Sequence, residues 1–133
     1  MRRIRNGSVL VLIALFLSGC GDGRIKARGR IVKNGAPFQL GEGEGLRIVF
    51  APVEASGATY ESYVAVFNKD GSFQVMGRDG KGLPPGKYRV ALEHLKKKQD
   101  LLKGAFDGQN TPIVREVTDG SNEIVIDLDH PAS

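Results

Sequence analysis

Apolar and polar residues alternate along most of the chain from residue 25 onward. In residues 25–31, apolar or small residues at odd positions are separated by basic residues at even positions. A period of two is typical of a β-strand with one face on a core and the other in water. Related patterns predict strands over 46–50, 60–67, 72–76, 87–95, 113–117 and 123–128. About seven short strands separated by turn residues predict an all-β fold, an antiparallel β-sandwich over residues 25–129.

The residues between these segments are those that tight turns require. Asn34-Gly35 follows the first strand, and Asp70-Gly71 separates two expected strands as in a β-hairpin. Residues 96–106 depart from the period of two, because Leu101, Leu102, Ala105 and Phe106 are spaced by three and four. We therefore expect one short helix near 96–106.

The first nineteen residues have the three-part layout of an export signal. Arg2, Arg3 and Arg5 precede an uninterrupted apolar run from Val9 to Leu17, and small residues follow. A membrane-spanning helix needs about 20 apolar residues, so this run is too short for a permanent span. We expect residues 1–19 to be removed from the mature protein.

The signal ends in Leu17-Ser18-Gly19-Cys20, which resembles the bacterial lipobox. The resemblance implies that Cys20 becomes the mature N-terminus and carries a diacylglycerol thioether, usually with a further acyl chain on its amine. The alternative is a plain signal peptide followed by an incidental cysteine. Residues 20–24 then form a short lipidated tether. Because Cys20 is the one cysteine in the sequence, no disulfide within the chain is possible.

Removal of the signal changes the charge of the protein. The full chain has 19 Lys and Arg against 15 Asp and Glu, a net charge of +4. Without Arg2, Arg3 and Arg5, 16 basic residues face 15 acidic ones, a net charge of +1. The charge and the expected export argue against a nucleic-acid partner. The remaining 114 residues are the usual size of one domain.

Several motifs occur in an order that resembles transthyretin-like, or carboxypeptidase regulatory-like, β-sandwiches. These motifs are Gly29-x-Ile31-x-x-Asn34-Gly35-x-Pro37, a strand ending in Phe50, Asp70-Gly71-x-Phe73, and Leu83-Pro84-Pro85-Gly86-x-Tyr88-x-Val90. The resemblance, with the lipobox, is to small bacterial lipoproteins built from one such domain. It implies a fold rather than a function, because these residues are turn and core residues.

We expect no enzymatic activity. The transthyretin-like hydrolases of 5-hydroxyisourate end in Tyr-Arg-Gly-Ser, whereas this chain ends in His130-Pro131-Ala132-Ser133, and it has no Gly-x-Ser-x-Gly nucleophile motif. His94 and His130 are the two histidines available as a base. We interpret His94 as a partly buried or rim residue, so no catalytic residue is assigned.

Metal and cofactor sites are also not expected. Asp127, Asp129 and His130 are the nearest approach to a hard-cation site, and the outward face of a terminal strand is the preferred interpretation. Asp70, Asp79, Asp107 and Asp119 each precede glycine, which is typical of turns. The glycine-rich segments lack the Lys-Ser/Thr of a phosphate-binding loop.

Two features bear on partners. Lys96-Lys97-Lys98 can contact anionic lipid headgroups or simply lie at a solvated strand end. Tyr60, Tyr63, Phe67 and Tyr88 suggest a carbohydrate or peptide platform, but Tyr88 alternates with charges as a core residue does, its hydroxyl bonded to nearby backbone.

The sequence therefore predicts an exported, membrane-anchored envelope lipoprotein with a non-catalytic binding or structural domain. Its expected partners are membrane lipid, through acylated Cys20, and an envelope protein or glycan. An accessory or inhibitor-like lipoprotein of an exported enzyme is the alternative, and a hydrolase is disfavoured. Gly21 after the cysteine, rather than Asp, favours the outer membrane where Asp marks inner-membrane retention.

Overall fold

The computed structural model describes residues 23–53, 61–118 and 123–132, and in these ranges the protein is all-β without a helix. Seven strands have four or more residues, and two have only two residues. In chain order they are β1 (Ala27–Lys33), β2 (Ala36–Pro37), β3 (Glu44–Pro52), β4 (Tyr63–Phe67), β5 (Ser72–Val75), β6 (Gly86–Lys96), β7 (Gln99–Asp100), β8 (Val114–Val117) and β9 (Ile124–Asp127).

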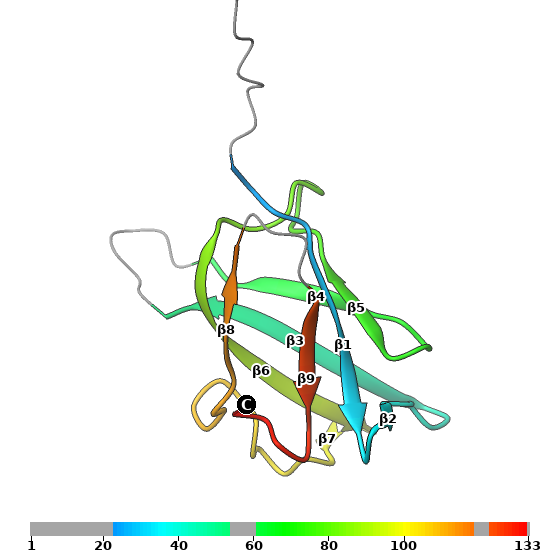
Figure 1. Ribbon diagram of the computed structural model, residues 1–133. Coiled ribbons are helices and arrows are strands. Elements are labelled where there is room, and N and C mark those ends of the chain that lie inside the picture. The colour runs from blue at the N-terminus through cyan, green and yellow to red at the C-terminus, as the bar shows by residue number, and fades with distance from the viewer. Residues whose placement is uncertain (1–22, 54–60, 119–122, 133) are drawn as a thin grey trace, which may run out of the picture.

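The strands form one sheet that folds over on itself. Its order is β2-β1-β5-β4-β3-β6-β7, with β8 also paired to β6 and β9 also paired to β1. Figure 1 shows β1 and β9 lying across from β3 and β6, so that two layers enclose the core. This arrangement is consistent with a β-sandwich, as the sequence predicts.

Inward-facing residues of both layers form the core. Along β1, Ala27, Gly29 and Ile31 are buried while Arg28 and Arg30 are exposed. The alternation predicted for the other strands is present in the same way. The largest fully buried side chains are those of Phe50, Phe73, Ile31, Ile48, Leu83, Leu92, Ile113, Ile126, Val75 and Val90. The period of two therefore identifies the core correctly.

The predicted turns are present and have a clear backbone reason. Asn34 and Gly35 both have positive φ, 53° and 73°, as the turn between β1 and β2 requires. Gly71 (φ 88°) lies between β4 and β5, where the Asp70 carboxylate accepts a hydrogen bond from the Ser72 backbone at 3.0 Å. These turns make the sequential pairs β1–β2 and β4–β5 antiparallel.

One pair departs from the antiparallel prediction: β1 and β9 are parallel. Gly29 is opposite Ile124, and Val32 is opposite Asp127. These are the first and last strands, so no short turn joins them or sets their relative direction. A strand's own residue pattern does not distinguish a parallel from an antiparallel neighbour, and the sequence therefore missed this feature.

The predicted helix near 96–106 is wrong. β6 ends at Lys96, residues 97–98 form a turn with positive φ at both lysines (49° and 65°), and β7 follows. The Asp100 carboxylate then accepts hydrogen bonds from the backbone N–H groups of His94, Leu102 and Gly104, each at 3.0 Å. A side chain that takes these donors favours successive turns over helix, which the spacing of the leucines does not reveal.

Candidate binding site at an open strand seam

β8 and β9 follow one another in the chain but do not pair. β8 joins the layer of β3 and β6 by pairing with β6, whereas β9 joins the other layer by pairing with β1. Figure 1 shows the two strands side by side at the same side of the sandwich. We call the gap between their outer edges the seam.

The outer edge of β8 faces this seam. Val90 donates its N–H to the Ile113 carbonyl at 2.9 Å, and Arg115 is opposite Tyr88. In an antiparallel ladder, alternate residues direct both main-chain groups to the same neighbour. Ile113 and Arg115 therefore bond toward β6, and the N–H and C=O groups of Val114 and Glu116 point into the seam.

The outer edge of β9 faces the seam from the other layer of the sandwich. The Leu128 N–H bonds to the Val32 carbonyl at 2.9 Å, which sets the parallel ladder between β9 and β1. By the same alternation, Ile126 bonds to β1 while the main-chain groups of Val125 and Asp127 point away from it. No strand of the described ranges pairs with either outer edge.

A groove of about 710 Å³ lies at the end of the seam nearest the N-terminus. It is lined by residues 25–28, Gln74, residues 115–118 and residues 123–125. Val114 and Val125 are two of the large apolar side chains left exposed, at 44% and 40%, one on each strand. The seam thus combines two strand edges without a strand partner in the described ranges with exposed apolar side chains.

Arg115 occupies an inward position of β8 and bridges the seam. Its guanidinium donates to the Val114 carbonyl at 2.9 Å, and across the seam to the carbonyls of Val125 at 3.5 Å and Pro131 at 3.3 Å. Burial lowers the pKa of this guanidinium. Arg115 was not predicted as a site residue, although the sequence contains a signal for it: Arg115 lies at the same parity as buried Ile113 and Val117.

His94 is partly buried, as the sequence predicts, and lies at the end of β6 away from β8. Its Nε2 lies 2.7 Å from Glu44 Oε2, and the two side chains are 14% and 15% exposed. The Gly41 N–H donates to the same carboxylate at 2.8 Å. This hydrogen bond, followed by the one with His94, lowers the pKa of Glu44. The Phe38 ring packs edge-on to the imidazole at 5.1 Å. We call the contacts of Glu44 with His94 and Gly41 the Glu44–His94 latch, because they hold the loop before β3 against β6. The sequence did not predict them, because Glu44 lies fifty residues from His94.

The acidic residues considered for metal binding act in turns. Asp127 Oδ1 accepts the Asp129 N–H at 2.9 Å, and Asp129 Oδ2 accepts the Asn34 N–H at 2.6 Å. Asp70, Asp79 and Asp107 likewise accept backbone N–H groups of nearby turns. Within the described ranges, no three His, Cys, Asp or Glu side chains are placed to hold a metal ion. Asp119 lies outside these ranges.

Three of the aromatic residues considered for a carbohydrate platform, Tyr63, Phe67 and Tyr88, pack in or against the core. Tyr63 and Tyr88 are buried and pack edge to face at 6.2 Å, and Phe67 packs against the core. The Tyr88 hydroxyl donates to the Pro84 carbonyl, as predicted, and burial raises its pKa to about 12. Tyr60 lies outside the described residues. The described tyrosines therefore form part of the core.

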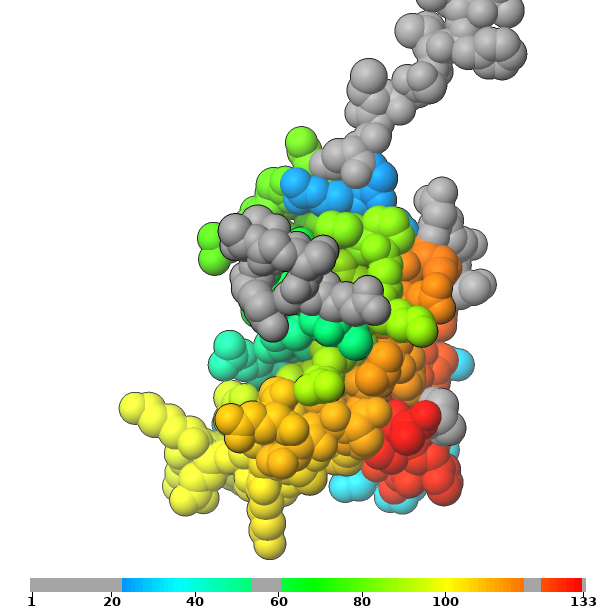
Figure 2. Space-filling model, turned by 90° about the vertical axis from the view of Figure 1, so that its left-hand side faces the viewer, coloured from blue at the N-terminus to red at the C-terminus, as the bar shows by residue number. Residues whose placement is uncertain are grey.

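Lys96, Lys97 and Lys98 lie at the far end of the sandwich from the point where residues 23–26 enter it. Figure 2 shows the yellow β6–β7 hairpin at one end and the blue N-terminal residues at the other. The expected signal (residues 1–19) and Cys20 lie outside the described residues. No described segment is a helix with the length and hydrophobicity needed to cross a membrane.

Comparisons with known protein families, with curated proteins and with solved structures find no match to this chain.

Proposed function

We propose that this protein is an exported lipoprotein, anchored through Cys20, whose sandwich binds an extended segment of another envelope protein at the seam. One observation carries the binding part of the proposal: two strand edges that pair with no other strand of the described ranges face each other beside a groove of about 710 Å³. An extended segment that adds as a strand satisfies the main-chain groups of such edges, and its alternate side chains supply specificity.

The chemistry of the seam favours a polypeptide ligand. Val114 and Glu116 on β8, and Val125 and Asp127 on β9, direct N–H donors and C=O acceptors into the seam, where Arg115 contacts the Val114 and Val125 carbonyls. Exposed Val114 and Val125 add an apolar contact for a side chain of the segment. Sugar sites generally need exposed aromatic rings, and the described tyrosines are buried, so a glycan ligand is less well supported.

Arg115 explains how such an edge stays free before binding. An inward-pointing charge on an edge strand discourages accidental pairing with other chains. Its contact with the Val125 carbonyl is 3.5 Å long, at the outer limit of a hydrogen bond. An incoming segment can therefore replace this contact at little cost, while the Val114 carbonyl stays bonded at 2.9 Å.

The anchoring part of the proposal rests on the sequence. The resemblance of Leu17-Ser18-Gly19-Cys20 to the lipobox supports acylation, and the resemblance to transthyretin-like lipoproteins agrees with the observed all-β fold. A non-catalytic role is supported by the sequence, which has no Gly-x-Ser-x-Gly nucleophile motif. Binding at the seam requires main-chain hydrogen bonds and apolar contacts, and no catalytic side chain.

Site-specific photo-crosslinking in the native envelope tests the binding proposal. A photo-reactive amino acid at Val125, in the full chain expressed in its own host, is expected to crosslink one defined envelope protein. The same amino acid at Val64, exposed on β4, is the matched control and is expected to give no such product. The identity of the crosslinked protein also separates a structural partner from an exported enzyme.

A pair of variants shows whether main-chain pairing holds the segment. Val114→Pro removes an N–H that points into the seam and is not part of the β6 ladder, whereas Val114→Thr keeps it. We expect the crosslink at 125 to be lost with Pro and kept with Thr, at similar thermal unfolding midpoints. Equal crosslinking in the Val114→Pro and Val114→Thr variants would contradict the proposal that the segment binds as an added strand. A photo-reactive amino acid at position 125 that gives no more product than one at position 64 would contradict it as well.

A further inference from the structure

Two described segments meet at the end of the sandwich where the chain enters from the expected tether. Residues 24–28 lead into and begin β1, and residues 76–83 connect β5 to the segment before β6. We call these residues the basic cap, because they contain five basic side chains and one acidic side chain. The basic residues are Arg24, Lys26, Arg28, Arg78 and Lys81, and the acidic residue is Asp79.

Close main-chain contacts fix the cap. Ile25 and Leu83 exchange two hydrogen bonds, of 2.8 and 2.9 Å, and the Gly82 N–H bonds to the Met76 carbonyl at 2.7 Å. A Cβ at Gly82 would lie 2.1 Å from the Ile25 carbonyl oxygen, so the two segments touch backbone to backbone. The cap is therefore a defined surface rather than two independent loops.

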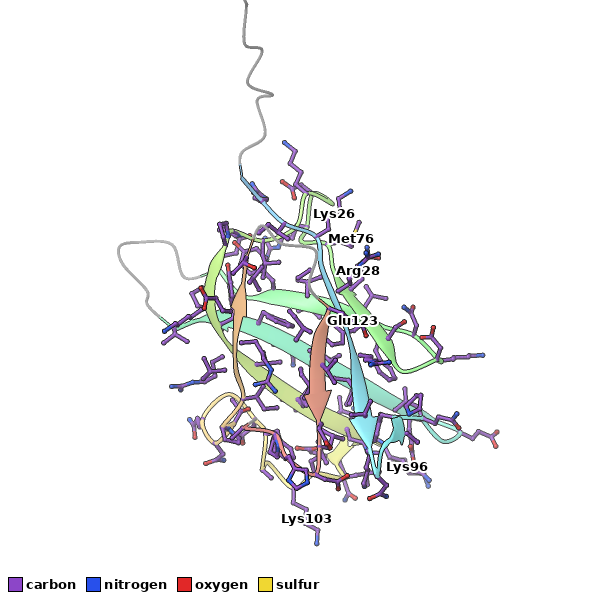
Figure 3. The ribbon with its side chains drawn as sticks, in the orientation of Figure 1. Lys26, Arg28, Met76, Lys96, Lys103 and Glu123 are labelled. Carbon is purple, nitrogen blue, oxygen red and sulfur yellow. The ribbon has the colours of Figure 1, made fainter. Side chains whose placement is uncertain are left out.

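The charges of the cap are arranged toward solvent. Arg24 is paired with Asp79 at 2.9 Å, and the Asp79 carboxylate also accepts the Lys81 N–H at 3.1 Å. This pairing uses the single acidic side chain of the cap. Lys26, Arg28, Arg78 and Lys81 remain as exposed cations. Figure 3 shows Lys26 at the end where the chain enters, with Lys96 and Lys103 at the other end.

We infer that the basic cap rests on anionic lipid headgroups when the protein is anchored. The inference builds on the proposed acylation, because four residues from Cys20 to Arg24 span at most about 14 Å. That length, together with a Debye length of about 8–10 Å, holds the cap within electrostatic range of a charged bilayer. Lys96–Lys98, at the far end, are held away from the same surface.

This orientation also concerns the proposed binding site. Residues 25–28 form one side of the groove at the seam as well as part of the cap. A cap on the headgroups places the groove beside the bilayer, so that a membrane-proximal segment of a partner is within reach. The far-end loops then point away from the membrane.

Vesicle binding by residues 21–133 without an acyl group tests the cap independently of Cys20. Every strand and core side chain of the described residues lies between residues 25 and 128, so this chain retains all of them. We expect binding to vesicles of phosphatidylglycerol mixed with phosphatidylcholine in low salt, and none to phosphatidylcholine alone. Arg78→Gln with Lys81→Gln is expected to lower the partition coefficient about thirtyfold, from two basic contacts.

The matched control removes the same charge from the other end. Lys97→Gln with Lys98→Gln should leave the partition coefficient within about twofold of wild type. Equal losses in the two double variants, or no binding by wild type, would contradict the inference without bearing on acylation. Binding to free polyphosphate but not to vesicles would also overturn it, since the cap would then be a soluble-polyanion site.

Discussion

Thr111 is the single buried polar side chain among the described residues, at 8% exposure. Its hydroxyl donates to the Val90 carbonyl at 2.6 Å and accepts the Ile113 N–H at 3.2 Å. It thereby satisfies two main-chain groups where the chain turns into β8. A buried group left without a partner costs more than the bond itself contributes.

Thr111→Val should therefore lower the free energy of unfolding by about 1–3 kcal/mol, because it leaves the Val90 carbonyl and the Ile113 N–H without this partner. Urea unfolding followed by circular dichroism measures the change. Thr118→Val, at an exposed position, is the control and should have little effect. Equal stabilities of the Thr111 and Thr118 variants would show that the hydroxyl is dispensable.

Glu44 gives the protein a pH-dependent contact. The Gly41 N–H and the His94 imidazole lower the pKa of its carboxyl below the ordinary 4.5. A carboxyl with a lower pKa in the folded state adds stability that is complete above its unfolded pKa and is lost as the pH falls through its folded pKa. The contribution of Glu44 is thus present near neutral pH and absent in acid.

Glu44→Gln is expected to reduce the loss of stability between about pH 6 and about pH 3, relative to wild type. Urea midpoints at the two pH values measure this loss. Glu42→Gln removes a nearby exposed carboxyl and should keep the wild-type pH dependence. The same pH dependence in the Glu44 variant and wild type would rule out the latch as a source of acid sensitivity.

At the scale of the elements, Gly29 permits the parallel pairing of β1 and β9. A Cβ at this position would lie 2.0 Å from the Ile124 carbonyl oxygen and 2.6 Å from the Phe73 ring. The glycine is therefore needed for close approach, since its own φ is not positive. It also lets the Phe73 ring lie directly over β1.

Gly29→Ala should cost at least about 2–3 kcal/mol of unfolding free energy, because the methyl group collides with backbone as well as with a ring. Gly45→Ala, on β3 with no atom within 4 Å of the added Cβ, is the control. Thermal unfolding of both variants measures the difference. A Gly29 variant as stable as the Gly45 variant would contradict the observed register of β1 and β9.

Arg115 links the free strand edges across the seam. Arg115→Met keeps the aliphatic stem but removes the donors to Val114, Val125 and Pro131. We expect faster amide hydrogen exchange at Ile126 and Leu128, whose N–H groups bond to β1, because β9 is then held less firmly, while amides of the β3–β6 ladder stay protected. Unchanged exchange at β9 would show that the guanidinium does not close the seam.

Strands and core were predictable from the sequence because burial in a sheet repeats every two residues. Ile31, Val90 and Ile126 were placed correctly by that period alone. The turns of residues 97–110 were not predictable, because they depend on Asp100 accepting three backbone N–H groups. The seam was not predictable either, because it arises from β8 and β9 pairing with different layers.

At the scale of the whole molecule, the two ends of the sandwich differ. One end carries the basic cap and the entry of the chain, and the other carries the β6–β7 hairpin with its lysines (Figure 3). The Glu44–His94 latch lies near the hairpin, since Glu44 is opposite Lys96 in the sheet. This difference between the two ends agrees with the proposed orientation, in which the basic cap contacts the membrane and the β6–β7 hairpin points away from it.

Mass spectrometry of the N-terminal peptide of the mature protein, purified from its host membranes, tests the central claim most directly. The account predicts a peptide that begins at Cys20 and carries a diacylglycerol group on its sulfur. The peptide of a Cys20→Ser protein should lack this group and retain the signal. A wild-type mature protein that begins elsewhere, or that has an unmodified Cys20, would contradict the proposed anchor.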